Sequence, residues 1–534
     1  MFGNYVLSLI TFIPLGAMAV VLCLPKDSHR TIRAVAVVAT GAVLVLCLWL
    51  WRDFVVNQGC LAEVAKATPQ THPQINAGYF RYYVSKPWIP DFHIYYKVGV
   101  DGLSVSLIIL TGLLSFLAAF SAFGIQTGVK GFYALYLLLV MGMMGVFVAL
   151  DFFLFYVFWE LMLLPMYFLI GLWGGPRREY AAIKFFLYTL VGSVLILLAM
   201  LAFYFKAPAK DLAFDIPYLI SAQVFGLNSE WHWLEKWLFW GLFIGFAIKV
   251  PVWPFHTWLP DAHVEAPTAI SVILAGVLLK MGGYGILRLN CPLLTATAGS
   301  EFVIMSLAVL GFISIIYGAL CAMAQTDFKR LVAYSSVSHM GYVLLGIASM
   351  QAGAINGAIF QMFNHGLSSA MMFLLVGVVY DRAHHRDLNR FGGLGLHMPK
   401  YFALGMVGFF AALGLPGLNG FISEAMVFLG SFKNGMIRPL VVASTPGIVL
   451  TAGYILWAIQ RVYLGPLKSE YQGFSDCTKV ELITLTPLAA GCILFGVYPK
   501  LMIDLFAPAT EVFLKVLGAA GGAGTALAQS GGAF

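Results

Sequence analysis

The sequence has little charge for its length. Asp, Glu, Lys and Arg make up 10% of its 534 residues, whereas 60% are apolar. Soluble domains carry about 25% charged residues, which they need to cover a surface that faces water. With a mean hydropathy of +0.88 as well, the composition excludes an ordinary soluble enzyme and indicates an integral membrane protein.

Other patterns are also missing. The net charge is +7, but the basic residues stand singly or in pairs at the ends of apolar runs, so they indicate topology rather than nucleic-acid binding. The seven cysteines form no CxxC pair and mostly lie in apolar runs, so we expect neither a disulfide framework nor a metal site. The first apolar run is too long for a signal peptide, so we expect it to be a retained span.

What the chain has instead is long apolar runs. A helix crosses a bilayer with about 20 apolar residues. We therefore predict an all-α polytopic membrane protein with about fourteen transmembrane helices. The predicted spans are 4–24, 32–51, 101–124, 132–150, 152–173, 181–205, 237–260, 267–290, 302–324, 329–349, 353–380, 401–430, 441–463 and 482–504. Between them, 52–100 and 206–236 read as long loops, and 518–534 as a disordered Gly/Ala-rich tail.

The positions of lysine and arginine predict the orientation, because short cytoplasmic loops are enriched in them. With the N-terminus outside, the short inner loops hold most of these residues and the short outer loops hold three, Arg288, Lys433 and Arg438. Both termini are therefore expected on the outer, periplasmic side of a bacterial inner membrane, in preference to a mitochondrial one.

Four charges do not fit this topology. Among 31 basic and 24 acidic residues, Lys249, Lys280, Glu160 and Glu424 stand out deep inside predicted spans. A charge near the bilayer centre costs roughly 2.5–3.5 kcal/mol and usually marks an ion or proton path. A structural ion pair, or a lysine reaching to the interface, is the alternative. We expect the four to translocate protons.

Helix-breaking residues accompany three of these charges. Pro251 and Pro254 follow Lys249, Gly282 and Gly283 follow Lys280, and Pro416 precedes Glu424. Proline removes a helix donor, and irregular backbone inside a membrane should line a cavity rather than face lipid. We expect broken helices at all three places.

Histidines add titratable groups between these charges. His339 and His365 lie inside predicted spans, between Lys280 and Glu424 in chain order. A lone histidine in a span is usually a packing residue, but here the order favours a relay. His256, Asp261 and His263 follow the proline break and suggest an inner proton inlet, with a structural corner as the alternative. The nearby prolines argue against a helical metal-ligand pair.

The spacing also suggests internal symmetry. Glu160 precedes Lys249 by about as many residues as His339 precedes Glu424, and many transporters are inverted repeats with matching broken helices. We predict two inverted five-helix repeats, 132–290 with the inner half-channel and 302–463 with the outer half-channel. Residues 1–131 would hold spans one to three and the long outer loop, and 464–534 the last span and a flexible tail.

The motifs 158–168 (FWELMLLPMYF) and 249–263 (KVPVWPFHTWLPDAH) resemble those of a known family, and the likeness extends from about residue 100 to 500. The chain resembles the antiporter-like membrane subunits of respiratory complex I, which are related to Mrp-type cation/proton antiporter subunits. Glu424 stands where sister chains carry lysine, as in the M-type subgroup. The resemblance implies a Glu160/Lys249 pair, a central relay at Lys280 with His339 and His365, and an exit at Glu424.

The resemblance further implies a subunit of proton-translocating NADH:quinone oxidoreductase without cofactors of its own. NADH, FMN, iron–sulfur clusters and quinone would belong to partner subunits, and homologous antiporter-like chains would be its neighbours in the lipid bilayer. Two alternatives remain open from the residues: an Mrp-type Na⁺/H⁺ antiporter subunit, and a structural membrane scaffold.

Overall fold

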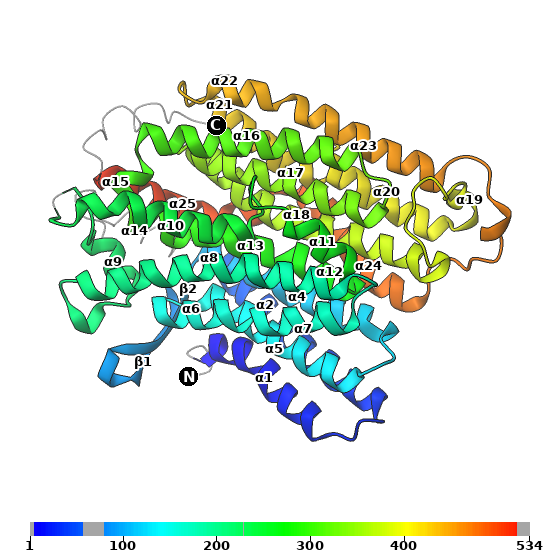
Figure 1. Ribbon diagram of the computed structural model, residues 1–534, viewed down its shortest axis with the longest axis horizontal. Helices are drawn as coiled ribbons and strands as arrows, with labels where there is room; N and C mark the ends of the chain where they lie inside the picture. The colour runs from blue at the N-terminus through cyan, green and yellow to red at the C-terminus, as the bar shows by residue number, and fades with distance from the viewer. Residues whose placement is uncertain (1–4, 57–78, 228, 521–534) are drawn as a thin grey trace.

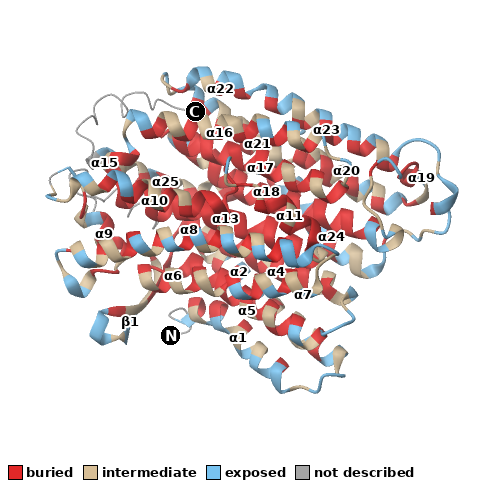
Figure 2. Ribbon diagram, in the orientation of Figure 1, coloured by how far each residue is buried: buried red, intermediate tan, exposed pale blue. Residues whose placement is uncertain are grey.

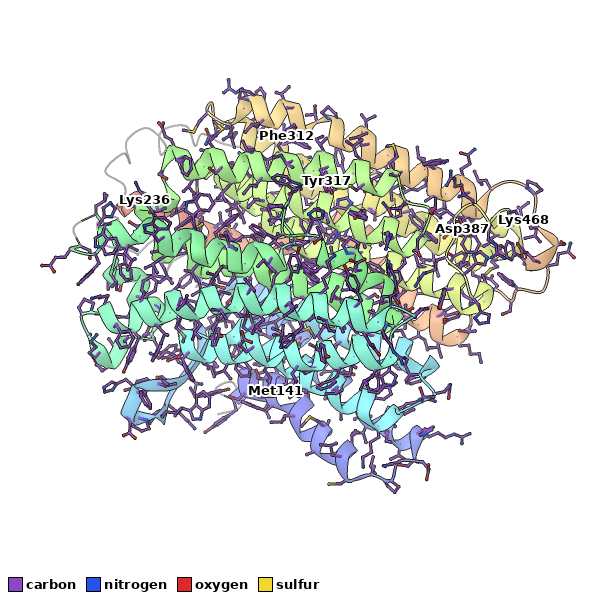
Figure 3. All side chains as sticks on the ribbon, viewed as in Figure 1. Met141, Lys236, Phe312, Tyr317, Asp387 and Lys468 are labelled. Carbon is purple, nitrogen blue, oxygen red and sulfur yellow. The ribbon has the colours of Figure 1, made fainter. Side chains whose placement is uncertain are left out.

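The structure is a computed structural model that describes residues 5–56, 79–227 and 229–520. Most helices run side by side along the long axis, with connecting segments gathered at two ends (Figure 1). A β-hairpin, α9 (Ile216–Ala222) and α15 (Thr295–Ala298) lie at one end, which we call the hairpin end. The short helix α19 (Leu394–His397) lies at the other, the α19 end. Lys236 and Lys468 mark these two ends in Figure 3.

Within the described residues, twelve helices are long and apolar enough to cross a membrane. They are α1 (Val6–Cys23), α2 (His29–Val56), α4 with η4 (Gly102–Gly124), α5 (Val129–Val148), α6 with α7 (Phe152–Trp173), α8 (Arg178–Lys206), α12 to α14 (Thr268–Leu293), α16 (Glu301–Met323), α17 (Phe328–Ala348), α18 (Ala352–Ala383), α22 with α23 (Arg438–Tyr463) and α24 (Lys479–Val497). The all-α membrane fold is thus confirmed. The count of fourteen stays a prediction, and its other two spans fall on α10 (His232–Lys249) and α20 (Pro399–Leu413).

Polar caps fix where several spans begin. The side chains of Asp101, Asp151 and Asp327 accept hydrogen bonds from backbone N–H groups in the first turns of α4, α6 and α17. Thr478 and Glu481 form a reciprocal capping box at α24. These caps satisfy N–H groups that have no partner within the helix.

The predicted loop 52–100 contains regular structure. β1 (Arg81–Ile89) and β2 (Ile94–Val100) form an antiparallel hairpin around a short turn, η3 (Pro90–Phe92). Residues 57–78 lie outside the described part. A second regular element was missed near the C-terminus, where α25 (Lys500–Ala520) forms an amphipathic helix. Its polar and apolar residues alternate at helical spacing, so it contains no long apolar run, and a search for apolar runs of about 20 residues does not find it. Most of the predicted tail, 521–534, lies outside the described residues.

Burial separates an inner group of spans from an outer group (Figure 2). α18 and the span Thr268–Leu293 are enclosed by protein, whereas α1, α2 and α23 expose apolar side chains. Val38 and Val449, for example, are 70% and 72% exposed. A surface of this kind matches lipid rather than water, so charged residues on the enclosed spans are shielded from both.

Two interruptions fall at the predicted prolines. α10 ends at Lys249, residues 250–257 form turns around Pro251 and Pro254, and α11 (Trp258–Glu265) follows. α20 ends at Leu413, and α21 (Asn419–Phe432) begins beyond Pro416. These two breaks lie beside the side chains of Lys249 and Glu424.

The prediction that Gly282 and Gly283 break their helix was wrong. Both lie within α13 (Leu279–Gly285), which is continuous with α12 (Thr268–Ile273) through a π-helical turn, η6 (Leu274–Leu278). A second π-helical turn, η7 (Ile286–Asn290), leads on to α14 (Cys291–Leu293). The glycines provide room instead. A Cβ on Gly282 would lie 2.6 Å from the Phe246 carbonyl oxygen, and one on Gly283 would lie 2.4 Å from the Met362 sulfur.

Candidate functional site

Lys280 lies at the centre of the enclosed helices. Its side chain is fully buried. Its Nζ lies 2.7 Å from Nδ1 of His365 on α18 and donates a hydrogen bond of 2.5 Å to the Ala275 carbonyl. The π-helical turn that contains Ala275 leaves this carbonyl within reach of the lysine. A lysine and a histidine in direct contact can pass one proton between them.

Two further contacts extend this row. The rings of His365 and His339 on α17 have centroids 5.4 Å apart. Nδ1 of His339 lies 3.1 Å from Oε1 of Glu424 on α21. All four side chains are buried. The structure therefore brings Lys280, His365, His339 and Glu424 together in one row, which runs across four helices in the middle of the protein.

Amide and hydroxyl groups that the sequence analysis missed surround the end of this row. Gln361 donates a hydrogen bond of 3.4 Å to Oε1 of Glu424, and Ser423 donates one of 2.5 Å to Oε1 of Gln361. Asn364 donates to the Asn419 carbonyl at 2.8 Å. A signal was present, because Gln361, Asn364 and His365 share one face of α18 at helical spacing. This polar stripe on an otherwise apolar span marks the side that faces α21.

Glu160 and Lys249 are not brought into contact. The Lys249 ammonium lies 5.0 Å from the Trp159 ring centroid and 5.9 Å from that of Phe185. Its Nζ, like Oε1 of Glu160, has no hydrogen-bond partner among the described residues. The charge of Glu160 nevertheless acts on Lys249. Two buried polar atoms without partners are costly, and such atoms are a common feature of sites that bind water or protons.

The helices that carry Lys249 and Lys280 pack closely. Gly282 on α13 lies against the end of α10, where an added Cβ would be 2.6 Å from the Phe246 carbonyl oxygen and 2.8 Å from the Val250 backbone nitrogen. The absence of a side chain at Gly282 thus sets the separation between the two lysine-bearing helices.

The residues of the predicted inner inlet differ in their burial: Asp261 is partly exposed, whereas His256 and His263 are buried. Asp261 forms ion pairs with Lys184 at 2.7 Å and with Arg330 at 3.6 Å, and it is partly exposed. His256 is buried, and the centroids of the Tyr317 and Tyr334 rings lie 5.1 and 6.4 Å from that of its own ring. Figure 3 shows Tyr317 on α16.

His263 is the second buried residue of the predicted inlet. It is fully buried and stacks on Phe373 at 4.4 Å, and neither ring nitrogen has a hydrogen-bond partner within the described chain. The charges of Lys329 and Lys280 both act on it. Lys329 is buried and donates a hydrogen bond to the Ala266 carbonyl at 2.5 Å. Lys329 is the first residue of the predicted span 329–349, and only its packing in the structure reveals that it is buried.

In the part of the chain that the structure describes, no group of three or more His, Cys, Asp or Glu residues is arranged to hold a metal ion. The six described cysteines are free. The buried groups described above are lysine, histidine and carboxylate side chains with amides and hydroxyls beside them, and such groups can bind and release protons.

Comparison with known proteins identifies the family. The model of the NADH:quinone oxidoreductase/Mrp antiporter transmembrane family matches residues 149–451. NADH-quinone oxidoreductase subunit M of Rhodobacter capsulatus is 42% identical, over 94% of this chain and 95% of that one. F(420)H(2) dehydrogenase subunit M of Methanosarcina mazei is 40% identical, over 82% and 87% of the two chains.

A solved structure agrees with these relatives. A chain of respiratory complex I from Thermus thermophilus with bound NADH is 29% identical, with 96% of this chain and 99% of that one covered and a TM-score of 0.81. The match spans nearly the whole of both chains, so the likeness holds for the complete arrangement of helices. The chain therefore belongs to the NADH:quinone oxidoreductase/Mrp antiporter transmembrane family.

Proposed function

We propose that this chain is a proton-translocating membrane subunit of an NADH:quinone oxidoreductase, of the M type. The observation that carries the proposal is the buried row Lys280, His365, His339 and Glu424, in which each group lies near the next. Such a row is expensive to bury, and its lysine, histidine and carboxylate groups can all take up and release protons.

Coulomb interaction supplies the mechanism. Electron transfer in partner subunits changes the charge at one end of the site, and each change alters the proton affinity of the next buried group because the interior screens charge poorly. Protons would reach Lys249 beside Glu160, pass to Lys280, and continue through His365 and His339 to Glu424. His256, Asp261 and His263 would form the inlet.

The electron donor is not a property of this chain. Two relatives of nearly equal identity are named for different donors, NADH in Rhodobacter capsulatus and F(420)H(2) in Methanosarcina mazei. We therefore assign NADH, FMN, iron–sulfur clusters and quinone to partner subunits, which supply the driving force, and assign proton transfer to this chain.

The proposal includes an orientation. Lys26, Arg177, Arg178 and Lys400 lie at or beside the connections α1–α2, α7–α8 and α19–α20. These connections lie toward the α19 end (Figure 1), and short loops rich in basic residues face the cytoplasm. We therefore propose that the hairpin end and both termini face the periplasm of a bacterial inner membrane. We also propose that the chain consists of four regions: 1–131, two inverted five-helix repeats at 132–290 and 302–463, and 464–534.

Neutral replacements of the two carboxylates test the function. Glu160→Gln and Glu424→Gln keep size and hydrogen-bonding capacity but remove the titratable group. In the purified complex in proteoliposomes, both variants should lower the number of protons released per NADH oxidised while the complex assembles. Glu301→Gln, at an exposed position at the start of α16, is the matched control. Normal pumping in both variants would favour a structural scaffold instead.

The family also includes Mrp antiporters, so an Na⁺/H⁺ antiporter subunit is the second candidate. Gentle purification of the tagged chain separates the two. Copurification of NADH dehydrogenase subunits supports our proposal, and copurification of antiporter subunits alone supports the second candidate.

A further inference from the structure

A second buried polar cluster lies toward the hairpin end, apart from the row just described. Arg288 on η7 donates a hydrogen bond of 2.5 Å to Oδ1 of Asp101, the N-cap residue of α4. Both side chains are buried, with 8% and 2% exposure. From its place near the end of an apolar run, Arg288 is expected in a short outer loop. The π-helical turn instead directs it into the protein.

Arg288 lies on the same continuous span as Lys280, Thr268–Leu293, and closer to its C-terminal end. Tyr284 and Arg288 follow Lys280 at successive intervals of four residues, so the three side chains lie toward one face. At 1.5 Å per residue, Arg288 is about 12 Å from Lys280 along the helix axis. Hydroxyl groups occupy the interval, because Oη of Tyr284 lies 3.2 Å from Oγ of Ser104.

A cavity lies next to Arg288, on the side away from Lys280. It has a volume of about 40 Å³ and is lined mostly by apolar side chains, among which Tyr79, Asp101, Arg288 and Thr510 carry polar groups. A cavity needs roughly 10–15 Å³ of this kind to hold one water. The space has room for two or three water molecules next to polar partners.

Arg288 interrupts the series of hydrogen-bonding groups that leads from Tyr284 and Ser104 to this cavity. Its guanidinium donates to Oη of Tyr284 at 3.3 Å and to Oγ of Ser104 at 3.3 Å, in addition to Asp101. A proton wire requires each member to accept a proton on one side and donate one on the other. A guanidinium has five donors and no acceptor and stays protonated, so it fills the acceptor positions of both hydroxyls without passing a proton. Its fixed positive charge also repels protons and cations, as in selective pores.

We propose that Arg288, held in place by Asp101, blocks a direct proton leak between Lys280 and the hairpin end of the chain. The inference rests on the proposed function, because a barrier is needed only where Lys280 carries protons. Asp101 offsets the cost of burying the guanidinium. Protons that reach Lys280 are thereby left with the route through His365.

Two substitutions of similar size separate this role from a structural one. Arg288→Gln and Arg288→Met both leave Asp101 without its cation. Glutamine can accept and donate hydrogen bonds and would continue the wire, whereas methionine keeps the interval apolar and dry. A structural ion pair would make the two variants behave alike, since both lose it.

The experiment uses the whole purified complex in proteoliposomes without NADH. A potassium gradient with valinomycin imposes a membrane potential, and a trapped pH-sensitive dye reports passive proton flux. We expect Arg288→Gln to leak several-fold faster than wild type, and Arg288→Met to leak at the wild-type rate. Adding Tyr284→Phe to Arg288→Gln should abolish the leak by removing the intervening hydroxyl.

A wild-type rate in Arg288→Gln, or equal leaks in the Gln and Met variants, would overturn the inference. If Arg288→Gln fails to assemble, Asp101→Asn/Arg288→Gln removes both charges together and is expected to leak in the same way; a wild-type rate there is equally fatal. Since the flux is measured without NADH, this inference can fail while Lys280→Met still loses pumping, and the proposed function would then stand.

Discussion

Nζ of Lys280 lies 2.7 Å from Nδ1 of His365. A protonated lysine has only donors, so when Lys280 is charged, Nδ1 of His365 must be the acceptor and any ring proton must sit on Nε2. When His365 holds a proton on Nδ1, Lys280 must be neutral to accept it. The contact therefore holds one shared proton, and its position depends on the charges on either side.

Removing the titratable rings tests whether the histidines carry protons or only order water. His365→Gln and His339→Gln retain hydrogen-bonding groups but do not titrate near neutral pH. Both should reduce protons released per NADH oxidised to the level of Glu424→Gln. His397→Gln, on α19 and remote from the row, is the control. Pumping at the wild-type ratio in both variants would mean that water alone bridges Lys280 and Glu424.

Gly282 should be intolerant of a side chain. In Gly282→Ala the new Cβ would lie 2.6 Å from the Phe246 carbonyl oxygen, so α10 and α13 must move apart, at a cost of about 1–3 kcal/mol. The expected result is a lower melting temperature and weaker pumping, because Lys249 and Lys280 lie on these two helices.

Gly241→Ala, also on α10, is the matched control. Nothing lies within 4 Å of its added Cβ, and alanine in a helix is more favourable than glycine by roughly 0.5–1 kcal/mol. We expect Gly241→Ala to leave stability and pumping unchanged or slightly improved. Equal tolerance at both positions would show that close packing at Gly282 does not matter.

Asp151 should make stability depend on pH. Burial raises the pKa of this carboxyl to about 7, although hydrogen bonds from the Leu154 and Tyr95 backbone and the charge of Lys97 oppose the shift. The unfolded value is about 3.9. Between these values the folded protein binds more protons than the unfolded chain, so this residue's contribution to stability falls as pH rises through that window.

Asp151→Asn removes this dependence, because a neutral asparagine still caps α6. Its melting temperature relative to wild type should therefore be higher at about pH 8 than at about pH 5. Asp211→Asn, at an exposed position, should show no such difference. An equal effect of Asp151→Asn at both pH values would contradict the assignment of a neutral buried carboxyl.

The sequence was sufficient for the all-α membrane fold and for the choice of the residues that form the central row. Charges such as Lys280 and Glu424 are conspicuous in apolar runs, and helices break at Pro251 and Pro416 because proline cannot donate a helical hydrogen bond. Proline alone does not decide, since Pro14 and Pro487 stand inside α1 and α24. Glycine is harder still to interpret. Gly282 gives room for a neighbouring helix, and nothing in the local sequence distinguishes this use from a break.

Residues at span ends were harder to predict. Lys329 and Arg288 stand near the ends of predicted spans, and position along an apolar run does not show which way a terminal side chain turns. Burial of these two depends on how α17 packs near Ala266 and how a π-helical turn rotates Arg288 toward Asp101. The second polar cluster depends on such contacts between segments that are far apart in the sequence. Local sequence patterns do not predict contacts of this kind.

The most direct test of the account is the number of protons released per NADH oxidised by the complex carrying Lys280→Met. Lys236→Met, at an exposed position on α10, is the control (Figure 3). We predict that Lys280→Met assembles but releases fewer protons per NADH, by the same amount as Glu424→Gln, while Lys236→Met matches wild type. A fully assembled Lys280→Met complex with the wild-type ratio would contradict the account.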